Sequence, residues 1–203
     1  MILVKDLTKK FDDFTAVNDV SFEIQKGEIC GYIGTNGAGK STTVKILTGI
    51  LDFNKGSVLI NDLDIKKDPV EVKKIIGYVP ENANLFNSLS PVEFLNFTGK
   101  VRDLTDKVIS ERINSFAEMF GFTDLVNDSI GNLSKGNKQK VMITSALIHD
   151  PHVIFLDEPL NGLDTNSIFV FHDLKDSLRA NEKLFFTAHI ILILLKKFLQ
   201  RSF

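Results

Sequence analysis

The residues with the clearest chemical signature lie at positions 34–42, which read GTNGAGKST. They match the pattern G-x-x-x-x-G-K-[ST], a loop whose backbone N–H groups converge on a phosphate chain. Such a loop needs unusual φ angles and a close approach of the backbone to the anion. Gly34, Gly37 and Gly39 allow both because they lack a Cβ atom. The segment therefore predicts a binding site for a nucleoside triphosphate.

Two side chains that follow these glycines have the chemistry to complete such a site. Lys40 can reach the β- and γ-phosphates as a point charge, and Ser41 can offer its hydroxyl to Mg²⁺. The helix expected to begin here turns its positive end toward the phosphates. We expect the nucleotide to contact the whole loop, namely Gly34, Thr35, Asn36, Gly37, Ala38, Gly39, Lys40, Ser41 and Thr42.

A second chemical signature is a pair of adjacent carboxylates at the end of an apolar run. Residues 153–158 read VIFLDE, so that Asp157 and Glu158 close the run. At a strand end the two acids can divide the work: Asp157 can hold the Mg²⁺ shell while Glu158 polarises the attacking water. The alternative is a strand closed by two solvated acids, but the phosphate-binding loop favours the catalytic interpretation.

The composition limits the classes of protein to be considered. The chain has 203 residues, 43% of them hydrophobic, which is enough for one substantial core. With 24 Lys and Arg against 26 Asp and Glu, its net charge of -2 gives no general attraction to nucleic acid or anionic lipid. Cys30 is the only cysteine, so no disulfide can form within the chain, and no apolar stretch is long enough to span a bilayer. The sequence thus predicts a soluble, cytoplasmic protein.

Hydrophobic periodicity places these residues on an α/β framework. Alternating apolar residues at 20–25 predict a strand with one wet face. Residues 29–33 read as the strand before the loop, and 153–156 as a buried parallel strand. Further predicted elements are strands at 57–60 and 75–79 and a helix over 43–48 that ends before Gly49.

The middle third of the chain, residues 85–150, follows helical spacing. Ser90 and Pro91 are a good N-cap and N1 pair, and apolar residues recur at helical spacing between positions 113 and 120. Another helix is expected to begin after Ser134, and its N-terminal end could bind an anion. By itself, that helix is an ordinary capped one. We interpret the segment as a helical subdomain inserted into the α/β core.

The order of these motifs resembles that of the ATP-binding cassette (ABC) ATPases. The family signature LSGGQ corresponds to LSKGN at residues 133–137, about twenty residues before the acidic strand end. NGLD at residues 161–164 resembles the D-loop of the dimer interface, and His189 resembles the switch histidine that contacts the γ-phosphate. The resemblance spans residues 2–190. It implies an α/β fold with a P-loop NTPase core of the RecA type, an N-terminal antiparallel β subdomain and a helical signature subdomain.

The resemblance also implies roles for individual residues. Ser134 and Gly136 would contact the γ-phosphate of a nucleotide held by a second cassette, so that two subunits share each ATP. Phe11 stands where the family stacks an aromatic ring on adenine. Glu81 stands where the Q-loop usually has Gln, and its carboxylate can ligate Mg²⁺ or its water. The expected catalytic residues are Glu158 and His189, and the expected metal ligands are Ser41, Glu81 and Asp157.

Two departures from the family pattern lie within the motifs. Glu81 in place of Gln is typical of exporter-type cassettes, so we interpret it as the marker of a subgroup. Lys135 and Asn137 replace Gly and Gln of the signature, while Ser134 and Gly136 are retained. The residues that would face the phosphate are therefore present.

A third departure lies in residues 191–203. After the switch histidine the family continues into an acidic amphipathic helix and further core elements, whereas residues 191–195 are wholly apolar. One hypothesis is a shifted reading frame or a truncated product. The other is a genuine, shortened final helix that packs on the core. The chain would then divide into a core with its β subdomain at 1–84 and 151–190, a helical subdomain at 85–150 and an atypical tail at 191–203.

The resemblance implies the ATP-hydrolysing subunit of an ABC transporter, powering export through a separate membrane permease. The permease would dock near the Q-loop and the helical subdomain, holding the protein at the inner face of the cell membrane. The other expected partner is a second cassette, identical or not, and no nucleic acid is expected. One alternative is a regulatory or truncated cassette that binds ATP without hydrolysing it. Another is a soluble cassette acting on ribosomes or DNA, although such proteins usually carry two cassettes or long coiled-coil insertions.

Overall fold

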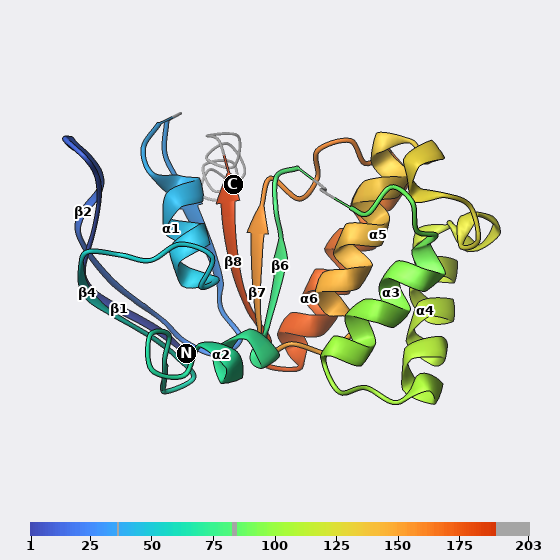
Figure 1. Ribbon diagram of the computed structural model, residues 1–203, viewed down its shortest axis with the longest axis horizontal. Coiled ribbons are helices and arrows are strands. Elements are labelled where there is room, and N and C mark those ends of the chain that lie inside the picture. Colours follow the sequence, from blue (N-terminus) through green and yellow to red (C-terminus); the bar gives the residue numbers. More distant parts are fainter. Residues whose placement is uncertain (36, 83–84, 190–203) are drawn as a thin grey trace, which may run out of the picture.

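The computed structural model describes residues 1–35, 37–82 and 85–189, which form two four-stranded sheets and the helices around them (Figure 1). The antiparallel sheet, in the order β2-β1-β4-β5, consists of β1 (Ile2–Phe11), β2 (Phe14–Ile24), β4 (Lys55–Ile60) and β5 (Leu63–Asp64). The parallel sheet, in the order β3-β8-β7-β6, consists of β3 (Ile29–Ile33), β6 (Ile76–Val79), β7 (Val153–Asp157) and β8 (Leu184–His189). The helices are α1 (Lys40–Leu47), α2 (Pro69–Ile75), α3 (Pro91–Val101), α4 (Asp106–Phe120), α5 (Lys135–Leu147) and α6 (Thr165–Ala180), with short 3-10 turns at Thr123–Leu125 and Ile130–Asn132.

The parallel sheet separates two hydrophobic cores. Side chains of successive strand residues point to opposite faces, so that Phe155 joins the core shared with α1 and the antiparallel sheet, while Ile154 joins the core under the other helices. All five residues of β7 are buried, as expected for a central strand covered on both faces. Figure 1 shows the resulting arrangement, with α1 between the two sheets and α3, α4 and α5 beyond the parallel one.

The predicted helix boundaries are confirmed where capping residues mark them. The Ser90 hydroxyl accepts a hydrogen bond from the Glu93 N–H, and the Glu93 carboxylate accepts one from the Ser90 N–H, a complete capping box with Pro91 in the first turn. Gly49 follows α1 with a φ of 67°, the left-handed conformation that ends many helices. Local sequence therefore fixes the start of α3 and the end of α1.

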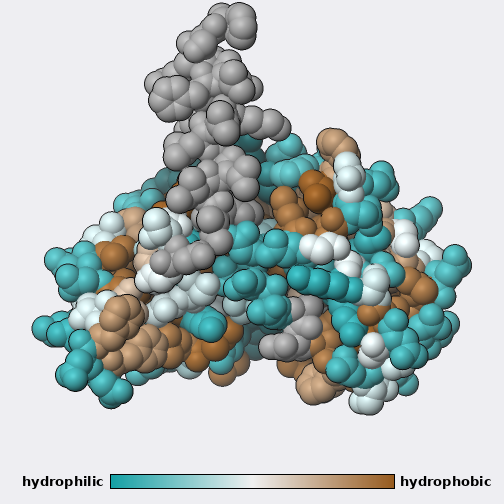
Figure 2. All heavy atoms as spheres, turned by 90° about the horizontal axis from the view of Figure 1, so that it is seen from above, coloured by the Kyte–Doolittle hydropathy of each residue, from teal (hydrophilic) through white to brown (hydrophobic). Residues whose placement is uncertain are grey.

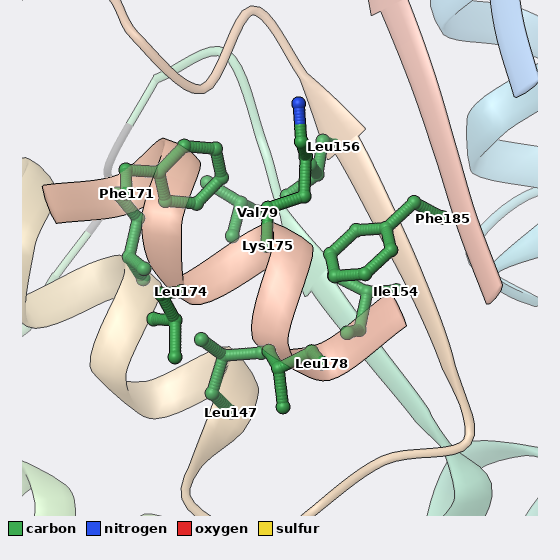
Figure 3. Close-up of a pocket in the computed structure, with 10 residues that line it drawn as sticks. Val79, Leu147, Ile154, Leu156, Phe171, Leu174, Lys175, Leu178 and Phe185 are labelled. Carbon is green, nitrogen blue, oxygen red and sulfur yellow. The ribbon is translucent and has the colours of Figure 1, made fainter. Parts of the chain in front are cut away.

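Helix α6 closes the second core against the parallel sheet. Figure 3 shows Phe171, Leu174 and Leu178 of this helix among the side chains that line one space together with Ile154 and Phe185 of the sheet. The side chains pack too tightly to admit a water molecule, so this space is a packing seam rather than a ligand site.

The fold class expected from the sequence is confirmed, but several elements were not foreseen. The first ten residues form most of β1, and β5, α2 and α6 were not predicted. Strand β3, which precedes the loop, lies at the edge of the parallel sheet, because no described strand pairs with its second side. It is therefore less covered than a central strand, and Ile29 and Ile33 are 37% and 42% exposed. Among the described helices, none is both long and apolar enough to cross a membrane. Residues 190–203, to which the two hypotheses on the tail refer, lie outside the described residues.

Candidate nucleotide-binding site

The chemically active residues gather at one edge of the parallel sheet. The strands β3, β7 and β8 run parallel, so their carboxyl ends meet at the upper edge in Figure 1. The phosphate-binding loop leaves β3 there, the two acids close β7 there, and His189 ends β8 opposite Ile33. The carboxyl edge of an open parallel sheet is the usual position of a ligand site in α/β proteins.

The loop curls around its own lysine. The Lys40 ammonium donates hydrogen bonds to the carbonyl oxygens of Gly34 at 2.7 Å and Thr35 at 2.8 Å, so the charge lies inside the loop. Helix α1 begins at Lys40, and its first N–H groups therefore open onto the same space. A lysine ammonium beside the N-terminal end of a helix is suited to binding a polyanion.

The glycines of the loop meet different constraints. Gly37 and Gly39 have φ angles of 80° and 81°, which confirms that the loop requires left-handed backbone. A Cβ atom on Gly39 would lie 2.2 Å from the Ala16 carbonyl oxygen, so the loop also packs directly on β2. Gly34 does not have a positive φ, so the expectation of an unusual angle there is wrong. A larger residue at this position would instead meet the Ala38 side chain, which lies 3.1 Å from an added Cβ. Asn36 lies outside the described residues.

Three carboxylates surround the end of β7, and one contacts the loop directly. Asp157 is 4% exposed, and the Ser41 hydroxyl donates a hydrogen bond to its carboxylate. Burial raises the pKa of the Asp157 carboxyl above its usual value, the Ser41 hydrogen bond opposes that rise, and the charges of Glu81 and Glu158 add to it. Burial, together with Asp157 and Glu81, also raises the pKa of Tyr78 to about 12. Burial is the largest cause of both shifts, and the charges of the neighbouring carboxylates add to it.

This donor set fits Mg²⁺. Hydroxyl and carboxylate oxygens are hard ligands, and Mg²⁺ is usually bound by one or two carboxylates together with substrate phosphates. Within the part of the chain that the structure describes, no group of three or more His, Cys, Asp or Glu side chains could hold a metal by itself. Ser41 and Asp157, with Glu81 nearby, are thus suited to a metal that arrives with a nucleotide.

Glu158 has a strained backbone. Its φ is 49°, in the left-handed region that costs a residue with a side chain about 1 kcal/mol or more. The Glu158 N–H donates to the Ala188 carbonyl at 3.3 Å, and its own carbonyl accepts from the Asn161 N–H at 3.2 Å. Neighbouring elements therefore hold the acid in a conformation that it would not adopt by itself.

Phe11 lies at the tip of the β1–β2 hairpin, paired with Phe14. Its ring is 44% exposed, with the Lys9 ammonium 4.8 Å from the ring centroid. Ala16, two residues beyond Phe14 on β2, contacts Gly39 of the loop. Since a strand advances roughly 3.3 Å per residue, the hairpin tip lies about 7 Å along β2 from the point where β2 contacts the loop.

The signature residues are not brought to the loop of their own chain. Ser134 is exposed at the N-terminus of α5, where its hydroxyl caps the helix by accepting from the Asn137 N–H at 3.2 Å. Gly136 packs on the D-loop, since an added Cβ would lie 2.6 Å from the Gly162 carbonyl oxygen. Helices α5 and α1 contribute to opposite cores, one on each side of the parallel sheet. Of His189, only the backbone belongs to the described part of the structure.

Comparison with known proteins decides the family. A family model described as "ABC transporter" matches residues 17–161. The chain belongs to the ABC transporter family. Its curated relatives include the ABC transporter ATP-binding protein NatA of Bacillus subtilis (strain 168), 36% identical over 197 residues, which are 94% of this chain and 80% of NatA. The probable multidrug ABC transporter ATP-binding protein YbhF of Escherichia coli (strain K12) is 36% identical over 164 residues, which are 81% of this chain.

A solved structure confirms the cassette fold. The ATP-binding subunit of an ABC transporter superposes with a TM-score of 0.91 at 28% identity, covering 97% of this chain and 82% of the other. The relatives differ greatly in length, and the chain spans only 28% of YbhF. The ABC ATP-binding family and its P-loop fold are thus established, as the motif order predicted.

Proposed function

We propose that this chain binds ATP with Mg²⁺ and hydrolyses it, as the ATPase subunit of an ABC exporter. The observation that carries the proposal is the contact between Ser41 of the loop and Asp157 of β7, with Glu158 beside it. It joins a triphosphate-binding loop to the acids that phosphoryl transfer requires. Steady-state phosphate release by the purified chain tests the proposal, and Lys40→Ala protein should show none above background.

Binding is assigned to the loop and to the hairpin. The N–H groups of residues 34–42 and the Lys40 ammonium receive the phosphates, while the Phe11 ring stacks on adenine. Ser41 and Asp157 hold Mg²⁺, with Glu81 or a water bound to it completing the set. When bound, Mg²⁺ neutralises charge on the β- and γ-phosphates. These assignments account for the exposure of Phe11 and for the burial of Asp157.

Hydrolysis is assigned to Glu158 and His189. The Glu158 carboxylate accepts a proton from the attacking water, an assistance typically worth about 10²–10⁴ in rate. His189, at the end of the strand between β3 and β7, contacts the γ-phosphate. Positioning and charge neutralisation by the loop and by helix N-termini supply the rest of the acceleration.

A complete site requires a second cassette. Ser134 and Gly136 lie at the start of α5, across the parallel sheet from the phosphate-binding loop of their own chain. Two cassettes arranged head to tail would bring each signature to the other subunit's loop. A mixture of two inactive variants tests this arrangement. Lys40→Ala protein lacks working loops, and Ser134→Arg protein lacks working signatures.

In the mixture, hybrid dimers regain one intact site, formed by the loop of one subunit and the signature of the other. If the chains associate at random, half of the dimers are hybrids and about a quarter of the wild-type activity returns. Activity equal to the sum of the separate variants would contradict a shared site between copies of this chain and would leave a different cassette as the partner.

The permease is proposed to dock on the helical subdomain beside Glu81. Phe86 and Phe97 are 59% and 55% exposed, and the Phe86 ring lies 6.2 Å from that of Phe94. Figure 2 shows hydrophobic surface over both ends of the molecule, including the helical end. Exposed aromatic clusters of this kind suit a protein interface. We expect a permease encoded beside the gene to stimulate ATP hydrolysis, and Phe97→Asp to abolish the stimulation while basal activity remains.

The export direction is supported by Glu81 and by the multidrug relative. A permease partner would hold the cassette at the inner face of the membrane.

We also propose the division of the chain into a core with its β subdomain at 1–84 and 151–190, a helical subdomain at 85–150 and a tail at 191–203. The competing function, a cassette that binds ATP without hydrolysis, is favoured by Lys135, whose stem covers Gly162 in the D-loop. Retained ATP binding without phosphate release, with and without the permease, would support that competitor.

A further inference from the structure

Helix α5 is tied to the residue that follows Glu158. The Gln139 side-chain amide donates a hydrogen bond of 3.0 Å to the Pro159 carbonyl oxygen, and both residues are buried. This carbonyl belongs to the peptide group immediately after the one that Glu158 and Pro159 share. The left-handed backbone of Glu158 persists only where neighbouring groups hold it. The hydrogen bond from Gln139 to Pro159 is one of the contacts that hold this backbone and so set the direction of the Glu158 side chain.

A second tether lies at the other end of the same loop, residues 158–164. The Lys140 ammonium, on a side chain that is 9% exposed, lies 3.2 Å from the Asp164 carboxylate. Asp164 also caps α6 by accepting hydrogen bonds from the Ser167 N–H and hydroxyl. The Ser167 hydrogen bonds and Lys140 together hold the pKa of the Asp164 carboxyl far below its usual range. The carboxylate is therefore ionised whenever the protein is folded near neutral pH.

The middle of the loop is also in contact with α5. The Gly162 carbonyl oxygen lies against Gly136, and the Lys135 side chain crosses Gly162, with its Cγ, Cδ and Cε atoms 3.1–3.4 Å from a Cβ that Gly162 would carry. Helix α5 thus touches the loop at its beginning, middle and end. The helix that presents the signature and the loop that carries the catalytic acid form one packed unit.

We propose that Gln139 is a positioning residue for ATP hydrolysis: through the Pro159 carbonyl it sets the direction of Glu158, while Lys140 anchors the far end of the loop. A shift of α5, caused by a nucleotide at its N-terminus, is then transmitted to the acid of the same chain. The inference rests on the proposed hydrolytic role of Glu158. The contacts lie within one chain. In a dimer they would link the two nucleotide sites, because α5 of a subunit would face one site while Glu158 of the same subunit serves the other.

Kinetics of Gln139→Met protein test this role. Methionine keeps the length and the apolar stem but cannot donate to Pro159. We expect kcat to fall about ten-fold, the scale of one lost buried hydrogen bond, with the KM for ATP unchanged. Lys140→Met should also lower kcat, and Lys140→Arg should restore it. The matched control is Lys138→Met, because the Lys138 ammonium bonds the Gly131 carbonyl at 3.2 Å, away from the loop, and its kcat should stay at the wild-type value.

Amide hydrogen exchange of the nucleotide-free protein gives a readout independent of turnover. In Gln139→Met protein the amides of Glu158 and of residues 160–164 should exchange about ten-fold faster than in Lys138→Met protein, while those of α5 keep their rates. Unchanged exchange in the loop, or an unchanged kcat in an active enzyme, overturns the proposal. If the wild-type chain hydrolyses no ATP, the proposed function is overturned, and the positioning role falls with it. The exchange data then still show whether the hydrogen bond from Gln139 to Pro159 holds the loop.

Discussion

Replacing Gly39 with alanine tests whether the loop geometry depends on its contact with β2. The new Cβ atom would face two obstacles. It would require a φ of 81°, and it would lie 2.2 Å from the Ala16 carbonyl oxygen. Gly37 offers a matched control, because its φ is 80° while, among the residues that the structure describes, none beyond its chain neighbours lies within 4 Å of an added Cβ. The two alanine variants therefore share the conformational cost and differ in the collision.

The magnitudes follow from these two terms. An alanine in the left-handed region costs about 1–2 kcal/mol, which is the whole expected loss for Gly37→Ala. Ordinary contact begins at 3.4 Å, so relief of the Gly39→Ala collision requires β2 or α1 to move by about 1 Å. Overpacking of this kind costs about 1–3 kcal/mol more. The expected loss of unfolding free energy for Gly39→Ala is thus about 2–5 kcal/mol.

Urea denaturation measures both losses, and titration with a fluorescent ATP analogue measures the effect on the site. We expect Gly39→Ala to be the less stable variant by at least about 1 kcal/mol and to bind the analogue more weakly than Gly37→Ala does. Equal losses of stability in the two variants would refute the reasoning, because the contact with Ala16 would then carry no energy.

Three further predictions concern the framework. Ser90→Ala should lower the unfolding free energy by about 1 kcal/mol in urea, because it removes the cap of α3, and an unchanged midpoint would contradict the capping box. Burial, followed by Arg102, lowers the pKa of His149 to about 4, below its ordinary value near 6.5. The unfolded chain then binds the proton more tightly, so stability should fall as the pH drops from about 6.5 to 4, by up to roughly 3 kcal/mol, and His149→Gln should flatten that part of the pH curve. Gly77→Ala should lose about 2 kcal/mol or more, since its Cβ would lie 2.2 Å from the Ala146 carbonyl; wild-type stability in urea would show that β6 and α5 are not in close contact.

Sequence reasoning succeeded where a local rule determines the structure. The loop at 34–42, the cap at Ser90 and the stop at Gly49 each depend on a few adjacent residues. Helix α6 was missed because four consecutive apolar residues, 168–171, hide the helical period of its sequence. Strand β1 was missed for a related reason. Register shifts between Val4 and Leu7 break the alternation that would identify it.

The candidate site could be predicted only in part. The types of Ser41, Asp157 and Glu158 indicate phosphate chemistry, but the hydrogen bond from Ser41 to Asp157 joins residues far apart in sequence and depends on the order of the parallel strands. The tether from Gln139 to Pro159 gave no sequence signal at all. A glutamine on a helix becomes informative only when packing places a carbonyl in front of it.

Glu158→Gln protein provides the most direct test of the central claim, because the amide keeps the shape of the side chain and cannot accept the proton. The account predicts that the variant binds ATP with wild-type affinity and that its steady-state phosphate release falls at least about 100-fold. Phosphate release at the wild-type rate from the purified variant would contradict the assignment of Glu158 and, with it, the proposed mechanism.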